Sequence, residues 1–457
     1  MAGVHIELKR LLRKEGLWNL FLASAYSSVL SSGNWVLAIF TITFFSYISA
    51  QLVEDPKVPE IYQTYITYTV ALSLITSGPL QLMFTRYVAD RLFEHKDEKV
   101  RPNYLGALML TMAMSFTIAF LLSFYLFEGL PYYYHLLFSF TVSVLGGLWL
   151  TNALLTGLKS YKHILFSFAF SYLLMGVLLV YAVRYGFWAT FLVFYVGNCL
   201  LLFLLALRVI KDYGSEDLLD FEFLSRKKSF YSLAFIGLFY NLAIWIDKFV
   251  FWFSPLTGEP VFANIRASVL YDIPVIFAYL SLIPGIAVFF MKLEVEFAYY
   301  YDQYYDAVRE WGTLEDLYRL ANKMIDSAKA LIYETLRVQF IFSFLLFLLQ
   351  ENLFKLLRIS YAYLPLLNVL MVGAILQLAF MVIFALLSYF DRRKEMLIIT
   401  SLFFLLNFTL SLLTQFLSPF FYGYGYTVSL LISDFVGLIL LRRFLHEVHY
   451  RTYMLSD

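Results

Sequence analysis

The chain has 457 residues, of which 61% are hydrophobic and 15% are charged, and its formal net charge is +1. A composition this apolar and this poor in charge excludes an ordinary soluble domain. The one cysteine, Cys199, excludes an intrachain disulfide, so the fold must be stabilised by packing between its elements.

Twelve apolar stretches follow one another along the chain, and each approaches the roughly 20 residues that a helix needs to cross a bilayer. The first is too long for a signal-peptide core and is expected to remain as a helix. The ninth is completed by part of the helix that precedes it. The sequence therefore predicts an all-α polytopic membrane protein with about 12 transmembrane helices. The stretches are 17–50, 61–84, 104–127, 133–157, 164–183, 187–207, 229–253, 265–291, 338–350, 361–388, 396–416 and 424–441.

Lys and Arg fall almost wholly on alternate sides of these stretches. The segments on one side hold 28 of them, whereas the intervening loops hold four. Basic segments stay in the cytoplasm, so both termini and the long loops are predicted to be cytoplasmic. The basic segments are the N-terminus, 85–103, 158–163, 208–228, 292–337, 391–395 and 442–457.

The polar segment 208–228 separates six predicted spans from six. Because each half has an even number of spans, repeated halves would share one orientation and be related by an axis along the membrane normal. A helix-breaking pair precedes the basic exit of both the second and the eighth span, Gly78-Pro79 and Pro284-Gly285, which favours such a repeat. The predicted order is an interfacial amphipathic helix at 1–16, a six-helix bundle at 17–207, a cytoplasmic linker at 208–228, a second six-helix bundle at 229–441 and a cytoplasmic tail at 442–457.

A cytoplasmic helical hairpin is predicted within the second bundle, at 292–337. Gly312 is expected to end its first helix, and Thr313 with Asp316 is expected to cap the second. The first helix carries an apolar face at helical spacing. This face is expected either to rest on lipid headgroups or to dock a cytosolic partner. It is formed by Tyr301, Tyr304, Val308 and Trp311.

The sequence has no nucleotide-binding loop, paired metal motif or catalytic signature, and its six histidines are scattered near the predicted interfaces. We therefore predict no enzyme activity, cofactor, metal site or nucleic-acid partner. Ionisable residues inside the spans remain as functional candidates, because a charge in hydrocarbon is costly.

Four such residues flank the loop between the seventh and eighth spans. Asp247 and Lys248 are predicted near the outer end of the seventh span, and Arg266 and Asp272 in the first turns of the eighth, joined through residues 254–258. Neighbouring residues differ by about 100° around a helix. Asp247 and Lys248 are therefore expected to point apart, one pairing with Arg266 and the other facing a cavity. The four form either a neutral structural network or the outer mouth of a polar substrate path.

Polar and aromatic residues of the first half are further candidates for a substrate path, with hydrogen bonds between helices as the alternative role. They are Asn34, Trp35, Trp149 and Asn152. Charges at the exits of the second and eighth spans are expected either to be solvated or to form a cytoplasmic gate. They are Arg86, Asp90, Arg91, Lys292, Glu294 and Glu296.

Several segments resemble the PelG family of exopolysaccharide transporters, and the resemblance runs from the first residue to the end of the chain. Asn34 stands where the pattern of the family has proline. The similarity is carried by MAGVHIELKRLLRKEG at 1–16, SSGNWVL at 31–37, RYVADRLFEHK at 86–96, IDKFVFWFSPLTGE at 246–259, RASVLYD at 266–272 and YYDAVREWGTLEDL at 304–317.

The resemblance implies a MATE-like flippase fold, with two six-helix bundles around a central cavity, in the bacterial inner membrane. It also implies export of a growing polysaccharide rich in N-acetylgalactosamine. The implied partners are a cytosolic glycosyltransferase (PelF-like), a cyclic-di-GMP receptor (PelD-like) and a small scaffold (PelE-like).

Three alternatives remain open: a flippase of lipid-linked oligosaccharides, an ion-coupled exporter of small molecules, and a membrane-bound polymerase or acyltransferase. Copurification with a glycosyltransferase separates the first two from the polysaccharide transporter. Turnover by the purified chain alone would indicate the enzyme.

Overall fold

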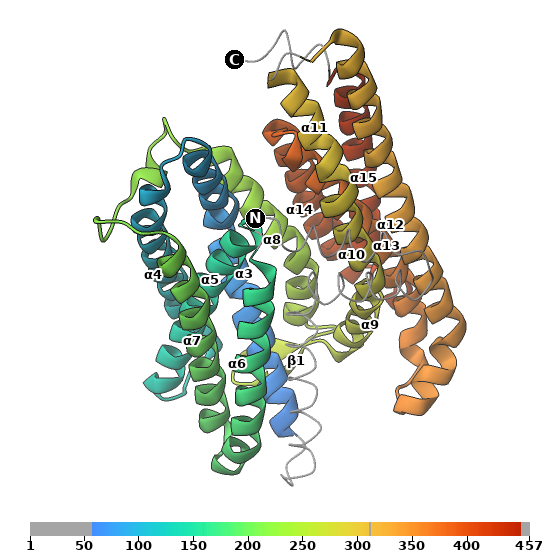
Figure 1. The fold of residues 1–457 in the computed structure, drawn as a ribbon. Coiled ribbons are helices and arrows are strands. Elements are labelled where there is room, and N and C mark those ends of the chain that lie inside the picture. Colours follow the sequence, from blue (N-terminus) through green and yellow to red (C-terminus); the bar gives the residue numbers. More distant parts are fainter. Residues whose placement is uncertain (1–56, 159, 310–311, 449–457) are drawn as a thin grey trace. The chain divides into compact units, whose positions relative to one another are not determined.

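Two compact units make up the part of the chain that the computed structural model describes, which is residues 57–448 without 159, 310 and 311. Unit 1 comprises residues 57–268 of this part and unit 2 comprises residues 269–448 (Figure 1). The units are divided after Ser268, and not at the 208–228 segment where the sequence places the boundary between two bundles. The predicted interfacial helix and the first span lie outside the described residues.

Unit 1 is built from long helices joined by short turns and one small β-hairpin. Its helices are α3 (Lys57–Phe93), α4 (Val100–Leu126), α5 (Tyr132–Gly157), α6 (Tyr161–Ala182), α7 (Phe187–Asp212) and α8 (Tyr231–Phe253). Short 3-10 turns lie at η1 (Asp97–Lys99), η2 (Val183–Tyr185) and η3 (Glu222–Leu224), and the hairpin strands are β1 (Glu259–Phe262) and β2 (Ile265–Ala267).

Helix α3 is the centre of unit 1 and packs against α4, α5 and α8. At its crossing with α8 the two backbones touch, because a Cβ added to Gly237 would lie 2.1 Å from the backbone oxygen of Gly78. Small residues permit this close approach between membrane helices. The Gly78-Pro79 pair therefore does not break the second predicted span, which runs unbroken as α3 and uses its glycine as a contact.

The β-hairpin turns at Ala263 and Asn264, where Ala263 has a positive φ of 51°. The Asn264 backbone N–H donates to the Leu126 carbonyl at 3.1 Å, and its side-chain amide donates to the Tyr125 carbonyl at 2.9 Å. These bonds satisfy carbonyls that the last turn of α4 leaves without intrahelical partners. The hairpin is thus fixed to unit 1.

Unit 2 contains the remaining predicted spans. Its helices are α9 (Val269–Leu280), α10 (Ile283–Lys292), α11 (Ala298–Arg309), α12 (Leu314–Leu357), α13 (Leu364–Tyr389), α14 (Arg393–Gln415) and α15 (Tyr424–His446). A π-helical turn, η4 (Leu293–Phe297), joins α10 to α11, and 3-10 turns lie at η5 (Tyr361–Tyr363) and η6 (Pro419–Phe421).

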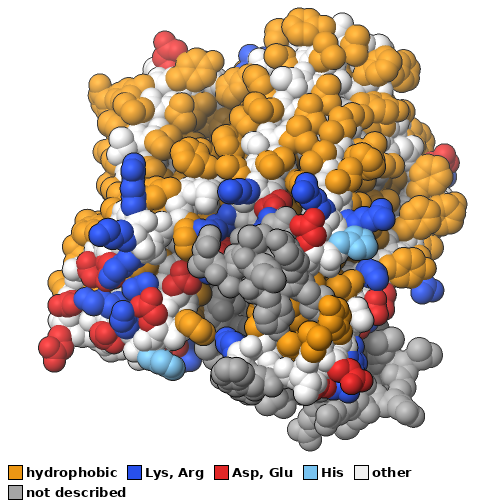
Figure 2. Space-filling model, turned by 90° about the horizontal axis from the view of Figure 1, so that it is seen from above, with side chains coloured by type: hydrophobic (Ala, Val, Ile, Leu, Met, Phe, Trp, Pro, Cys, Tyr) orange, Lys and Arg blue, Asp and Glu red, His pale blue; other side chains and the backbone are white. Residues whose placement is uncertain are grey.

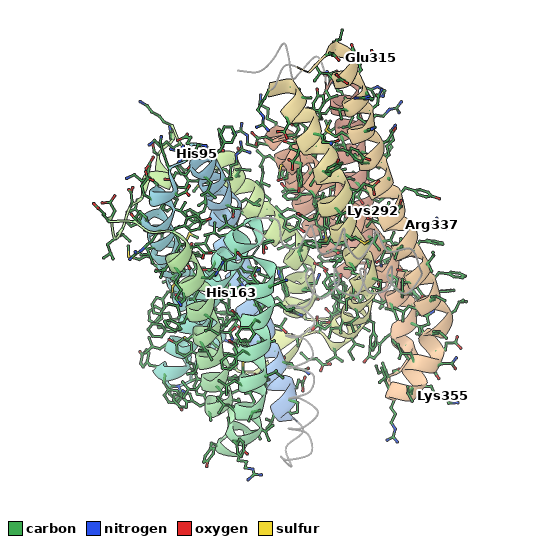
Figure 3. The ribbon with its side chains drawn as sticks, viewed as in Figure 1. His95, His163, Lys292, Glu315, Arg337 and Lys355 are labelled. Atoms are coloured by element: carbon green, nitrogen blue, oxygen red, sulfur yellow. The ribbon has the colours of Figure 1, made fainter. Side chains whose placement is uncertain are left out.

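The eighth predicted span is broken, whereas the ninth is continuous with the cytoplasmic hairpin predicted before it. Helices α9 and α10 meet at a bend of 40° near Ser281, so the helix-breaking pair predicted here does interrupt the span. Helix α12 has 44 residues, and Thr313 caps it by accepting a bond from the Asp316 N–H at 3.2 Å, which confirms the predicted cap. Glu315 and Lys355 mark the two ends of α12, with Arg337 between them (Figure 3).

Nine helices of the described part are long and apolar enough to cross a membrane, or ten if the bent α9–α10 pair is one span. Helix α13 is apolar along its length and packs against α9, α12 and α15, which makes it the core of unit 2. The prediction of an all-α polytopic membrane protein is confirmed.

Candidate functional site

Asp247 and Lys248 form an ion pair within α8, and both are buried, with 0% and 4% of their surface exposed. The Lys248 ammonium lies 3.2 Å from Oδ1 and 3.1 Å from Oδ2 of Asp247, and it donates to the Ile244 carbonyl at 2.9 Å. The expectation that the two neighbours point apart is wrong, because the flexible lysine stem curls back along the helix to meet the carboxylate. We call this pair the α8 ion pair.

Arg266 lies in β2 and not in the first turn of a helix, because the chain continues into the β-hairpin and α9 begins only at Val269. Its Nε donates to the Trp252 carbonyl at 3.1 Å and its Nη2 to the Gly258 carbonyl at 2.5 Å. A cation at a helix C-terminus is favoured by the helix dipole. Among the described residues no ion pair joins Arg266 to Asp247, so the expected pairing is replaced by a cap on α8.

Tyr68 of α3 fixes this cap from the other side. Its hydroxyl donates to the Arg266 carbonyl at 2.8 Å, and its ring stacks on Trp252 with the centroids 4.8 Å apart. Asp272 lies in the first turn of α9, as predicted, but in unit 2. The four predicted charges are therefore divided between the two units.

The candidates of the first half have different surroundings. The Trp149 indole N–H donates to the Ser73 hydroxyl at 2.9 Å, which joins α5 to α3. The side-chain oxygen of Asn152, one turn further along α5, is buried and has no hydrogen-bond partner in the described part of the chain. Asn34 and Trp35 lie outside the described residues.

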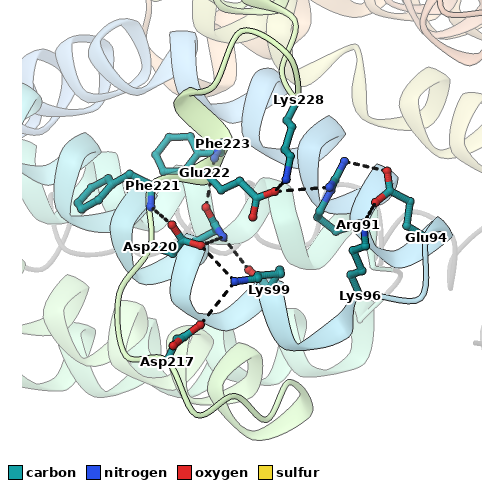
Figure 4. Close-up of polar contacts among 11 residues, drawn as sticks. Arg91, Glu94, Lys96, Lys99, Asp217, Asp220, Phe221, Glu222, Phe223 and Lys228 are labelled. Atoms are coloured by element: carbon teal, nitrogen blue, oxygen red, sulfur yellow. Dashed lines mark hydrogen bonds and ion pairs between the residues drawn. The ribbon is translucent and has the colours of Figure 1, made fainter.

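The 208–228 segment is docked on unit 1 and is not a loose linker (Figure 4). Arg91 of α3 is 5% exposed and contacts Glu94 at 2.9 Å and Glu222 at 3.6 Å. The Asn103 side chain donates to Asp220 at 3.3 Å and accepts from the Phe223 N–H at 3.1 Å. We call this set the linker clamp; it consists of Arg91, Lys99, Asn103, Asp217, Asp220, Glu222, Phe223 and Lys228.

An aromatic contact and further ion pairs complete the linker clamp. Phe223 is buried and packs edge-on against Phe84 with the centroids 5.5 Å apart. Lys99 lies 3.5 Å from Asp217 and 3.7 Å from Asp220. Basic and acidic side chains gather together at the left of Figure 2, in keeping with these pairs. Arg91 is therefore a buried anchor and not a solvated charge.

Four other gate candidates form ion pairs within their own units. Arg86 lies 3.1 Å from Asp90, one turn further along α3. Lys292 lies 2.8 Å from Glu296 and 2.8 Å from Glu334, so it joins the end of α10 to α12. Glu294 lies in the π-helical turn η4.

The predicted docking face of α11 packs inside unit 2. Tyr304 is 0% exposed, and the Tyr301 hydroxyl donates to the Tyr389 carbonyl at 2.9 Å while its ring contacts Phe390. Tyr301 therefore holds the hairpin to the junction of α13 and α14, and the buried Tyr304 offers no surface to a partner. Val308 is half-buried, and Trp311 lies outside the described residues.

Two features of the sites were not predicted from the sequence. Asp434 is buried in α15, and an acidic residue ten positions into the twelfth apolar stretch was the signal that could have found it. The pairing of Arg91 with Glu222 has no such signal, because the two residues are 131 positions apart.

Comparisons with known proteins assign the family and the fold. The chain matches the family described as "PelG: Putative exopolysaccharide Exporter (EPS-E)" over residues 1–453. No curated protein sequence matches it.

Solved structures share the fold at low sequence identity. A MOP superfamily transporter from Pyrococcus furiosus is 12% identical, with 93% of this chain and 96% of that chain covered and a TM-score of 0.63. An outward-facing multidrug resistance MATE family transporter is 13% identical, with 98% and 99% covered and a TM-score of 0.62. An inward-facing one is 12% identical, with 91% and 96% covered and a TM-score of 0.60. The chain is thus a polytopic membrane exporter with the fold of MOP superfamily transporters, and it belongs to the PelG family of exopolysaccharide exporters.

Proposed function

We propose that this chain exports a growing, Pel-like polysaccharide rich in N-acetylgalactosamine from the cytoplasm to the periplasm. The observation that carries this proposal is the family match over residues 1–453. The chain would lie in the bacterial inner membrane with both termini in the cytoplasm, as the 28 to 4 distribution of Lys and Arg favours. Its partners would be a glycosyltransferase, a cyclic-di-GMP receptor and a small scaffold.

The polar residues of unit 1 support a weakly charged cargo. The α8 ion pair adds no net charge to the span, so it places little electrostatic barrier before a neutral sugar chain. The buried side-chain oxygen of Asn152 is an acceptor that a sugar hydroxyl would satisfy. We assign Asn152 and the α8 ion pair to the substrate path. Within unit 2, we assign the Lys292 pairs with Glu296 and Glu334 to a cytoplasmic gate.

The test compares polymer on the two sides of the membrane. In cells that keep the synthase, deletion of this chain should stop secretion of polymer that binds a lectin specific for N-acetylgalactosamine, and re-expression should restore it. The purified complex should contain the glycosyltransferase. Secretion that continues without the chain would refute the proposal, as would purification of an active exporter that never associates with a synthase.

The shared fold makes an exporter of small molecules the second candidate, since multidrug resistance transporters have it. The same deletion strain separates the two, because a small-molecule exporter would change resistance to cationic dyes and leave polymer secretion intact. If the chain were instead a flippase, the deletion strain would accumulate lipid-linked oligosaccharide on the cytoplasmic leaflet. Polymerisation by the purified chain alone would show an enzyme and contradict both exporters.

The proposed orientation has its own test. Ser215 and Ser418 lie in opposite predicted loops, and Cys199→Ser supplies a background without cysteine. A membrane-impermeant thiol reagent added to intact cells with a permeable outer membrane should label Ser418→Cys and not Ser215→Cys. Labelling of both from the same side would contradict the orientation.

A further inference from the structure

Asp434 is a carboxyl group in the middle of α15, the helix that corresponds to the twelfth predicted span. It lies ten residues after the start of α15 at Tyr424 and twelve before its end at His446, which is about 15 Å from the first turn. It is 4% exposed, and neither carboxyl oxygen has a hydrogen-bond partner in the described part of the chain.

Contacts on either side of Asp434 place it in an apolar layer between α13, α14 and α15. On one side, the Tyr426 hydroxyl donates to the Gln377 side chain at 3.0 Å. On the other side, a Cβ added to Gly437 would lie 2.9 Å from Ile383 and 3.6 Å from Ile399. Buried side chains of α13 and α14 occupy the level between these contacts, and they are Leu378, Phe380, Val382, Thr400 and Phe403.

The hydroxyl groups near Asp434 donate elsewhere. Ser433 donates to the Ser429 carbonyl at 2.7 Å, and Thr400 of α14 donates to the Met396 carbonyl at 2.8 Å. Each hydroxyl has one proton to donate. The carboxyl group therefore receives no hydrogen bond from either.

Among the described residues, α13 and α14 pack against α15, and neither has an opposite charge at the level of Asp434. Helix α13 has no Asp, Glu, Lys, Arg or His, and its titratable group is Tyr389 at its end. The charges of α14 are confined to its first turn, Arg393–Glu395. On α15 itself, Arg442 is eight residues from Asp434, about 12 Å along the axis. Tyr426 lies eight residues away in the other direction, and its hydroxyl is 3.4 Å from the hydroxyl of Tyr279 in α9.

An ionised carboxylate in this layer would be buried, without a hydrogen bond and without a facing charge on α13 or α14, and such a charge is far less stable than the neutral acid. We propose that Asp434 is a proton-binding site that couples export to proton movement. The carboxyl group is neutral in the conformation described. When α15 separates from α13 and α14, the O–H bond breaks, the proton passes to water, and the carboxylate keeps the electron pair. Reprotonation from water precedes closure.

Infrared difference spectroscopy on the full-length protein in lipid nanodiscs tests the protonation state without any substrate. The spectrum of the wild type minus that of Asp434→Asn at neutral pH should contain the carbonyl band of a protonated carboxylic acid. Asp434→Glu should shift this band and keep it, which leaves the test valid if the Asn variant is not recovered. A carboxylate band at neutral pH, with or without sodium, would overturn the proposal.

Export of polymer tests the coupling and rests on the proposed function. Asp434→Asn keeps a neutral side chain of the same shape, so it should reach wild-type levels in the membrane but secrete at least tenfold less polymer. Asp434→Glu should secrete measurably, and the neighbouring control Ser433→Ala should match the wild type. Wild-type secretion by Asp434→Asn would overturn the coupling. Absence of secretion by the wild type would instead count against the proposed function and leave the spectroscopic result standing.

Discussion

The α8 ion pair and the linker clamp neutralise charge in opposite ways within the same unit. Asp247 and Lys248 are neighbours on one helix, so their ion pair lies within α8. The linker clamp joins residues that are more than 100 positions apart and holds residues 217–228 on the ends of α3 and α4. The first arrangement makes charge tolerable inside a span, whereas the second uses charge to determine where a segment lies.

The largest expected effect comes from breaking the α8 ion pair. Asp247→Ala leaves Lys248 buried without its carboxylate, which typically destabilises by about 3 to 5 kcal/mol. The midpoint of thermal unfolding in detergent and the level of folded protein should both fall. The double variant Asp247→Ala with Lys248→Met removes both charges and should recover most of the loss. A double variant as unstable as the single one would show that the pair does more than neutralise itself.

An intermediate effect is expected from the anchor of the linker clamp. Arg91→Ala removes the ion pairs to Glu94 and Glu222 and the contact of the guanidinium with the Tyr87 ring, 5.3 Å from its centroid. Loss of hydrogen bonds to a charged group costs about 2 kcal/mol, or roughly thirtyfold in the population with an undocked linker. Tryptic cleavage after Arg226 or Lys227, timed on the folded protein, should accelerate accordingly.

The matched control for this experiment is Arg208→Ala, which removes an exposed pair with Asp212 on α7. Cleavage of the linker should be unchanged in this variant. Equal acceleration in both variants would mean that the linker responds to the overall charge and not to the clamp.

The smallest effect is expected at Lys99, which is about one-third exposed and lies 3.5 Å and 3.7 Å from its two carboxylates. Exposed pairs contribute less than about 1 kcal/mol and are screened by salt. Lys99→Gln should accelerate linker cleavage slightly in dilute buffer and not at all in about 1 M salt. An acceleration that persists in high salt would place Lys99 among the buried anchors.

The sequence predicted the features that depend on local pattern. The long apolar stretches became helices, and the cap at Thr313 and the continuity of α12 with the ninth span are confirmed. The predictions failed where contacts between residues far apart in the sequence determine the structure. Arg266 was placed in a helix because nothing local shows that Asn264 bonds to the end of α4. Tyr301 and Tyr304 were predicted to form an exposed apolar face because the sequence does not show that Tyr301 packs on Tyr389 and Phe390 or that Tyr304 is buried.

In the candidate site, too, the features set by local sequence pattern were predicted and those set by side-chain contacts were not. The place of Asp247 and Lys248 in a span was predicted, but their burial and mutual contact were not, because the contact depends on the bend of one side chain. Asp434 is likewise an ionisable group inside an apolar stretch. Its proposed role as a proton-binding site depends on the structure, which shows no facing charge on α13 or α14. The role of Asn152 in a substrate path stays a prediction.

The unbroken course of α12 gives unit 2 a mechanical property that its neighbour α9–α10 lacks. A helix of 44 residues is a rod of about 66 Å. The bend near Ser281 can act as a joint that absorbs rotation, whereas α12 has no joint between Leu314 and Leu357. A tilt of about 5° at one end would therefore displace the other by about 6 Å. If the hairpin is cytoplasmic, as the sequence predicts, force applied to it by a growing polymer or a bound protein would be transmitted along α12 to the other end of this helix.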